Sequence, residues 1–450
     1  MSTKKTRLRL SLMILFVLVL NAQTNHATAN RLSETVNPVK WDSFKQNHTA
    51  GKDEEQCRRI LSNAVRYNLS WINNTFKLDN ERDLYLIEQY NEHGVRPASS
   101  VCYAIAVALK CAKMNDQELG VSPETALAMT KRLIKGVTSA YYQNSTNGKG
   151  WGNVWQSAFW ATLAGQGAWL LWDELDSETR IMISRMVIGE ADRFIVPDYK
   201  VPYWISADGT VNTPGDSKAE ENAWNSGILS LAVAMMPLHP HCNDWKQVCS
   251  ELIISAFASK DDLHNQQIMD GKPVMDWLQG YNVGDNGMVI NHNLIHPDYT
   301  AAITLNSRSC IIQPLAGQKF FDGALMNFTH IYNSLTTHKW LSPPYLQPGG
   351  TIYIRGKADI YYPQGTDWSN FRYDIFYLLD VNMYVFNLDK GLEHKAIDWV
   401  RTRADRIEAM QARHKDGKMF APDEFSTYSG CNQMTAWQLA DAFLFFWLYS

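Results

Sequence analysis

The chain has 450 residues, a formal net charge of −4 and 45% hydrophobic residues. This apolar content is enough for a large core, and the slightly acidic balance without a basic block argues against a nucleic-acid partner. Aromatic residues make up 12% of the chain, which suits both a core and the stacking of sugar rings on aromatic faces.

The N-terminus has the pattern of a secretion signal. Basic residues between positions 4 and 9 precede an apolar run over residues 10–20, which is too short to span a bilayer. An Ala-x-Ala site ends at Ala29. We expect a signal peptide over residues 1–29, cleaved after Ala29, and one domain over 30–450 in a secreted or periplasmic protein. A membrane anchor is the alternative for the first segment, and no later stretch reads as a membrane span.

The cysteines do not predict a disulfide framework. Their number is seven, so at least one thiol is unpaired, and several lie in apolar helical runs where a buried thiol behaves as a small hydrophobe. No Cys-x-x-Cys pair suggests zinc.

Apolar periodicity and capping signals predict two kinds of helix in alternation. One kind is amphipathic, over residues 53–76, 122–142, 176–195, 243–257, 317–335 and 391–411. The other is apolar nearly all round, over residues 97–113, 153–172, 218–236, 297–314, 368–386 and 434–449. A helix that is apolar on every side belongs inside a fold, and one with a polar stripe belongs outside.

The loop lengths alternate as well. Connections from an apolar helix to the next amphipathic one are short (173–176), whereas the return connections are long (196–217 and 259–296). Long loops carry function more often than short ones. We therefore predict an all-α fold, an (α/α)6 barrel or toroid of alternating inner and outer helices, with its mouth at the N-termini of the inner helices. Segment 343–362 has β character and predicts a small hairpin near the cleft. A tandem α-solenoid is the alternative, which the alternating loops disfavour.

The densest polar stretch is residues 285–299, which ends where Pro297 opens an apolar helix. It holds the candidate catalytic residues Asn291, His292, Asn293, His296 and Tyr299. The other predicted inner-helix starts add Arg372 as a further catalytic candidate. Candidate substrate-binding residues at those starts and on the predicted hairpin are Arg96, Trp151, Trp155, Glu221, Asn222, Asn225, Arg355, Trp368 and Tyr373. The aromatic residues among them suit the core equally well, and the acidic ones also suit helix capping.

A metal is not expected in this stretch. His292 and His296 are four residues apart, but Pro297 places both before the helix, and no third ligand stands at metal spacing. A structural calcium on Asp208, Asp216 or Asp285 is a weaker alternative.

These residue types suit a uronate glycan. Eliminative cleavage removes the C5 proton beside the carboxylate, which requires a group that neutralises the carboxylate, a base, and an acid for the leaving oxygen. Asn, His, Arg and Tyr can supply these functions, and no G-x-S-x-G motif offers a serine nucleophile.

An Asn-His dipeptide at an inner-helix start with a nearby Tyr resembles the (α/α) toroid polysaccharide lyases. The resemblance, over roughly residues 90–450, implies that Asn291 or Asn293 and His292 neutralise the carboxylate or abstract the proton, and that Tyr299 carries the proton. It also implies Arg355 and Arg372 as carboxylate ligands. The chain departs from many of those lyases because it has no large C-terminal β-domain, which favours a compact, exo-acting barrel such as one trimming a rhamnosyl-glucuronate cap.

Two other functions fit the same residues. A glycoside hydrolase on this barrel, of the two-carboxylate or unsaturated-uronide type, would use Glu221 with Asp298 or Asp367. A non-catalytic glycan-binding protein would use the aromatic residues alone.

Overall fold

The computed structural model describes residues 36–44, 50–425 and 430–450. The expected signal peptide at 1–29 lies outside the described residues. The protein is mostly helical, and the strands of the described chain are two-residue pairs that close no larger sheet. The all-α prediction is therefore confirmed.

The α-helices follow in chain order as α2 (Lys52–Thr75), α3 (Val95–Lys110), α4 (Asp116–Leu119), α5 (Pro123–Ser139), α6 (Ser157–Leu170), α7 (Ser177–Asp192), α8 (Ala219–Met235), α9 (Cys242–Ala256), α10 (Pro297–Ala301), α11 (Ser309–Leu315), α12 (Phe328–Thr337), α13 (Tyr373–Val385), α14 (Ala396–Ala412) and α15 (Cys431–Tyr449). Short 3-10 helices are η1 (Trp41–Ser43), η2 (Trp172–Glu174), η3 (Lys260–His264), η4 (Val274–Asp276), η5 (Ala302–Arg308) and η6 (Asp322–Leu325). The antiparallel strand pairs are β1 (Leu78–Asp79) with β2 (Leu84–Tyr85), β3 (Ile205–Ser206) with β6 (Gly280–Tyr281), β4 (Ile268–Met269) with β5 (Lys272–Pro273), and β7 (Ile290–Asn291) with β8 (Leu294–Ile295).

Capping residues set several of the helix starts. Ser122 accepts a hydrogen bond from the Thr125 amide at the start of α5, whose first residue is Pro123. Asp176 does the same for the Thr179 amide at the start of α7, at 2.8 Å. Both starts are where the sequence predicts them, because a cap depends only on neighbouring residues.

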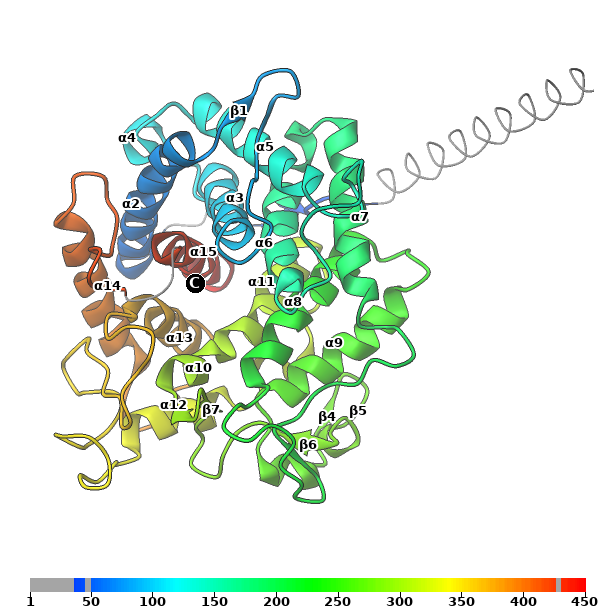
Figure 1. Ribbon diagram of the computed structural model, residues 1–450. Coiled ribbons are helices and arrows are strands. Elements are labelled where there is room, and N and C mark those ends of the chain that lie inside the picture. Colours follow the sequence, from blue (N-terminus) through cyan, green and yellow to red (C-terminus); the bar gives the residue numbers. More distant parts are fainter. Residues whose placement is uncertain (1–35, 45–49, 426–429) are drawn as a thin grey trace, which may run out of the picture.

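Burial separates the helices into two kinds, as predicted. Every residue of α6 is buried and nearly every residue of α3, α8 and α13 is, whereas α2, α5, α7, α9 and α14 each keep an exposed face. The buried helices pack on one another in the order α3, α6, α8, η5, α13, α15, and α15 packs back on α3. Figure 1 shows the partly exposed helices around them.

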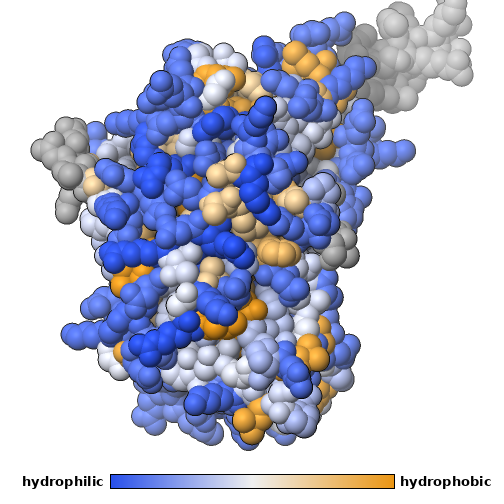
Figure 2. Space-filling model, turned by 90° about the vertical axis from the view of Figure 1, so that its left-hand side faces the viewer, coloured by the Kyte–Doolittle hydropathy of each residue, from blue (hydrophilic) through white to orange (hydrophobic). Residues whose placement is uncertain are grey.

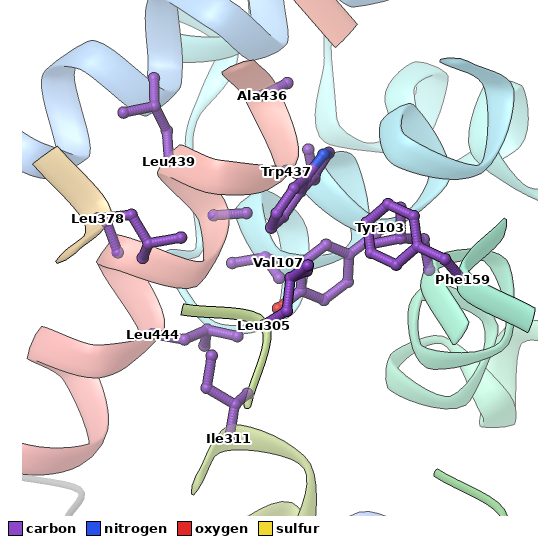
Figure 3. Close-up of a cluster of buried hydrophobic side chains, with 14 of the residues drawn as sticks. Tyr103, Val107, Phe159, Leu305, Ile311, Leu378, Ala436, Trp437, Leu439 and Leu444 are labelled. Atoms are coloured by element: carbon purple, nitrogen blue, oxygen red, sulfur yellow. The ribbon is translucent and has the colours of Figure 1, made fainter. Parts of the chain in front are cut away.

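The middle of the molecule is apolar, and a polar cross-link centred on Asp441 runs through it. Figure 3 shows side chains from α3, α6, η5, α11, α13 and α15 meeting in this core. Within it, Asp441 on α15 accepts hydrogen bonds from Tyr103 on α3 and Arg308 on η5. Arg308 also donates to Gln166 on α6. Four helices that are distant in sequence are thus joined at one buried point.

The helix predicted over 297–314 is divided in the structure into α10, η5 and α11. The hydroxyls of Thr304 and Ser307 donate hydrogen bonds to the backbone carbonyls three residues earlier, at 3.1 and 2.8 Å. Such side-chain bonds compete with the backbone ladder and favour the tighter 3-10 geometry.

The predicted hairpin over 343–362 is not formed by paired strands. That segment has isolated bridges, such as Tyr353 with Ile360, and it is rich in prolines, which cannot donate ladder hydrogen bonds. The hairpin nearest the predicted catalytic residues is instead β7 with β8. Helix α12 also begins later than predicted, at Phe328, after Asn327 in a left-handed conformation.

The surface and the cysteines complete the fold. Figure 2 shows a mostly hydrophilic face with small, scattered apolar patches. Among the residues described, none of the helices combines the length and the hydrophobicity that crossing a bilayer requires. All seven cysteines are free thiols, and six of them are buried.

Candidate active site

A cavity opens where the N-terminal ends of the buried helices meet. Its empty space, open mouth included, is about 590 Å³. Each buried helix contributes lining residues from its first turns or from the residues just before it: Arg96 at α3, Gln156 and Phe159 at α6, Glu220 and Trp224 at α8, Asp298 and Tyr299 at α10, Trp368 and Arg372 before α13, and Met434, Trp437 and Gln438 at α15. The structure thus brings Arg96, Tyr299, Trp368 and Arg372 of the predicted site residues to one place.

The turn between β7 and β8 holds the histidine at the cavity rim in an uncommon backbone conformation. His292 has φ 53° and Asn293 has φ 62°. The Asn293 amide donates to the Gly215 carbonyl at 2.9 Å, which ties the turn to the loop before α8. Left-handed conformations of residues other than glycine are strained, and they are concentrated at functional sites.

A carboxylate lies between the two histidines of this stretch. Asp367, from the loop before α13, approaches His292 Nδ1 with Oδ2 at 2.6 Å and His296 Nε2 with Oδ1 at 3.1 Å. Partial burial would raise the pKa of Asp367, but the hydrogen bonds from His296 and His292 outweigh it and hold the pKa below its usual value. An ionised carboxylate only accepts, so both facing nitrogens carry protons.

Tyr299 completes a chain of polar contacts from the rim into the cavity. Its hydroxyl lies 3.4 Å from Nε2 of His292, the nitrogen that faces away from Asp367. Burial, reinforced by the charges of Glu220 and Asp367, raises the pKa of Tyr299, so its phenol keeps its proton at neutral pH. In its neutral form, a His292 ring that donates Nδ1–H to Asp367 has a lone pair on Nε2, which faces the Tyr299 hydroxyl.

Glu220 is a buried carboxyl in the cavity wall. Its Oε1 accepts a hydrogen bond from the Asn291 side chain at 3.1 Å, and its Oε2 has no partner among the described residues. Burial raises the pKa of Glu220 to about 8, helped by the charges of Asp216 and Glu221 and opposed by Lys218. The group is therefore mostly protonated at neutral pH.

Asp298 is the second buried carboxyl of the cavity. Its Oδ1 accepts from the Tyr362 hydroxyl at 3.0 Å, while its Oδ2 is unpartnered and lies 3.9 Å from His296 Nδ1, which is unpartnered too. Burial raises the pKa of Asp298, with Arg372 and His296 opposing the shift. Burial likewise lowers the pKa of His296, against the pull of Asp298 and Asp367.

The cavity also contains two arginines. Arg96 donates to Gln156 Oε1 at 2.8 Å, and Arg372 pairs with Asp374 at 3.4 Å while its guanidinium lies 5.3 Å from the Trp368 ring centre. The lining thus carries two guanidinium groups, and the one on Arg372 is already paired with Asp374. Such a wall suits an anionic ligand.

Several predicted site residues lie elsewhere. Trp151 is buried and donates its indole N–H to the Val137 carbonyl. Asn222 donates to the Pro202 carbonyl and to Ser255, while Tyr373 donates to Asp359. The side chains of Trp151, Asn222 and Tyr373 thus make structural contacts, and none of them lines the cavity.

Arg355, Glu221, Asn225 and Asn291 also stand apart from the cavity wall. Arg355 is exposed beside His394, because the segment that carries it does not form the expected hairpin over the mouth. Glu221 pairs with Lys218 at 3.3 Å. Asn225 and Asn291 are both buried, and the Asn291 side chain donates to Glu220. Neither residue is among those that line the cavity. Trp155 is 58% exposed outside it and packs edge-to-face on Trp224, with ring centres 5.1 Å apart.

The sequence suggested the wrong face of α8. A helix that is apolar all round carries no polar stripe to fix its orientation, and each residue step turns the side chain by about 100°. Glu220 and Trp224, one turn apart, face the cavity, whereas Glu221 pairs with Lys218 at the start of the same helix and Asn222 donates to Pro202 and Ser255.

Metal-ligating types converge at one point in the described parts of the chain. His292, His296 and Asp367 offer ligand atoms that all lie within 4.8 Å of one another. The calcium candidates Asp208, Asp216 and Asp285 do not form such a group, and Asp216 instead pairs with Lys218.

No protein-family model and no curated protein sequence matches this chain.

Proposed function

We propose that the protein is an (α/α)6 toroid enzyme, exported from the cell, that cleaves a uronate-containing glycan by β-elimination. The cyclic order of contacts among α3, α6, α8, η5, α13 and α15 supports the toroid. The observation that carries the activity is the chain Asp367, His292, Tyr299 at a cavity that also holds Arg96 and Arg372.

Each step of the elimination has a group in position. Arg96, held by Gln156, and Arg372 bind the uronate carboxylate and withdraw charge from it, which acidifies the C5 proton. His292 Nε2 takes that proton, and Asp367 orients the ring and stabilises the imidazolium that results. As the C4–O bond breaks and the C4–C5 double bond forms, Tyr299 gives its proton to the leaving oxygen.

The same contact resets the site. After the reaction His292 carries an extra proton and Tyr299 has lost one. The two groups are 3.4 Å apart, so the proton passes from Nε2 to the phenolate oxygen. No water is consumed, and the product is an unsaturated uronide.

The cavity wall also fits a sugar. Trp224, Glu220, Asp298 and Gln438 line it, and each has a buried polar atom without a hydrogen-bond partner among the residues described. Buried polar groups are normally satisfied, so unpartnered atoms at a cavity favour a polar ligand. The aromatic rings of Trp155, Trp224 and Trp368 offer stacking surfaces.

The test is a screen of the purified protein against a panel of uronate glycans. We expect ultraviolet absorbance from the conjugated C4–C5 double bond to grow with at least one of them. His292→Ala should lower the rate by about 10²- to 10⁴-fold, the usual contribution of a general base. His241→Ala, which removes another histidine beside a carboxylate, is the matched control and should leave the rate unchanged.

A second candidate is a glycoside hydrolase, which the two carboxyls of Glu220 and Asp298 favour because both line the cavity with an unpartnered oxygen. Reducing ends that appear without the ultraviolet absorbance would support it and contradict the lyase. A glycan-binding protein would give binding heat with neither product.

A further inference from the structure

We propose that His292, His296 and Asp367 form a binding site for a zinc-class divalent cation, with one coordination position open to solvent. Two imidazole nitrogens and one carboxylate oxygen lie within 4.8 Å of one another. Three protein ligands with an open fourth position are the pattern of accessible zinc sites.

The three ligands come from two segments, residues 292–296 and the loop at Asp367, that are distant in sequence and that the fold holds together. His292 lies on the β7–β8 turn and His296 just before α10, while Asp367 reaches them from the loop before α13, over 75 and 71 residues of sequence. His292 Nδ1 and His296 Nε2 both point at the same carboxylate, and their ring planes are 86° apart with centres at 6.0 Å. A cation bound between these atoms takes the place of the two protons that His292 Nδ1 and His296 Nε2 donate to Asp367. Each proton then moves to the other nitrogen of its ring.

The surroundings contain the outer contacts that ligating histidines need. A metal-bound imidazole usually donates its second N–H to a carboxylate or another acceptor. His296 Nδ1 and Asp298 Oδ2 are both buried, both unpartnered and 3.9 Å apart. With a cation on Nε2, His296 carries its proton on Nδ1, and a small approach of the two side chains from 3.9 Å lets it donate to Asp298 Oδ2.

The accessibility and the ligand types select the cation. The side chains of His292 and Asp367 are 45% and 46% exposed, whereas His296 is 1% exposed, so the ion would rest on a fixed inner ligand and face solvent on the other side. Imidazole favours zinc and its first-row neighbours, whereas calcium and magnesium prefer oxygen ligands throughout.

Cation binding has a consequence for the proposed elimination, and this consequence alone rests on the proposed function. A cation on His292 Nδ1 forces the ring proton onto Nε2, the atom that would act as base. Zinc should therefore inhibit cleavage, and removal of zinc should restore it. Binding without inhibition would contradict the role of His292 as base and leave the cation site intact.

The experiment is a titration of the chelator-treated, full-length mature protein with Co²⁺, followed by displacement with Zn²⁺. We expect one Co²⁺ per chain with the visible absorbance of a four-coordinate site, and loss of that absorbance on adding Zn²⁺. Asp367→Asn should weaken Zn²⁺ binding by at least the ~10- to 100-fold that loss of an outer contact typically causes. His296→Ala should do the same, and Asp367, being half exposed, is the safer variant for folding.

The matched control is His241→Ala. His241 Nδ1 lies 2.9 Å from Asp192, near His239, but these groups do not converge as ligands. The control should bind Zn²⁺ as tightly as the unchanged protein. Absence of the Co²⁺ absorbance, or equal binding by Asp367→Asn and His241→Ala, would overturn the proposal and leave only adventitious surface binding.

Discussion

Buried carboxylates at the centre and at the cavity of this molecule differ in how their oxygens are hydrogen-bonded. In the centre, both oxygens of Asp441 accept hydrogen bonds, one from Tyr103 and one from Arg308. Asp380, beneath α14, is satisfied in the same way by Tyr332 and Arg403. At the cavity, Glu220 and Asp298 each have one satisfied oxygen and one without a partner in the described chain.

The difference separates groups that stabilise the fold from groups that await a ligand. Removing one partner of a satisfied buried ion pair is strongly destabilising, because the remaining charge stays in a medium of low dielectric constant. A half-satisfied carboxyl is already unfavourable, and a bound molecule can relieve it. The two cavity carboxyls thus each have an oxygen that is unpartnered among the described residues, whereas both oxygens of Asp441 and of Asp380 are bonded. Substitution in both places tests this comparison.

The largest expected effect is at the centre. Asp441→Asn leaves Arg308 without its carboxylate and should lower the free energy of unfolding by about 3–5 kcal/mol. Asp298→Asn keeps the acceptor for Tyr362 and should change it by less than about 1 kcal/mol. Denaturant unfolding of both variants measures this, and equal losses would remove the distinction between the two regions.

The next effect is on activity at the cavity. Tyr299→Phe removes the proposed proton donor and should lower kcat on a responsive glycan by about 10²- to 10³-fold. Its hydroxyl contacts His292 at 3.4 Å, a long hydrogen bond, so the free energy of unfolding should change by less than about 1 kcal/mol. Initial rates and unfolding curves on the same preparation provide the check, and a drop in both would assign Tyr299 to the fold instead.

A smaller effect concerns pH. Glu220 has a pKa of about 8 in the folded protein because of burial, whereas the unfolded chain releases this proton near the ordinary value. Between those two values the folded state binds the proton more tightly, so stability is fully present at low pH and falls as the pH rises. Glu220→Gln does not titrate, so its unfolding free energy should gain on the unchanged protein by about 2–4 kcal/mol between pH 5 and pH 8.

Unfolding curves of the two proteins at several pH values test this expectation. A constant difference across that range would mean that Glu220 is ionised in the folded cavity.

The smallest effect is at the rim. Trp155→Ala removes an exposed ring and should weaken glycan binding by about fivefold, or roughly 1 kcal/mol, the scale of one aromatic contact. Tyr384→Ala, an exposed aromatic substitution on α13 away from the cavity, should leave KM unchanged. If both variants bind equally well, Trp155 is not a stacking surface.

Much of this arrangement could be predicted from local sequence, and the remainder could not for physical reasons. The helices and the gathering of their starts follow from periodicity, caps and loop length, all of which act over a few residues. The orientation of α8 could not be predicted, because a helix that is buried on all sides has no polar stripe that would show whether Glu220 or Glu221 faces the cavity. Asp367 as the partner of His292 was equally out of reach, since such a pairing depends on how distant loops pack.

The polar cross-link through the centre also bears on how the protein folds. Tyr103 and Asp441 are 338 residues apart in sequence, so the apolar face of α3 that packs on α15 stays uncovered until α15 has docked. Topologies dominated by such distant contacts fold slowly, and their incomplete forms expose surface that promotes aggregation. A chain that ends before α15 should therefore depend on chaperones to remain in solution, whatever its earlier helices have achieved.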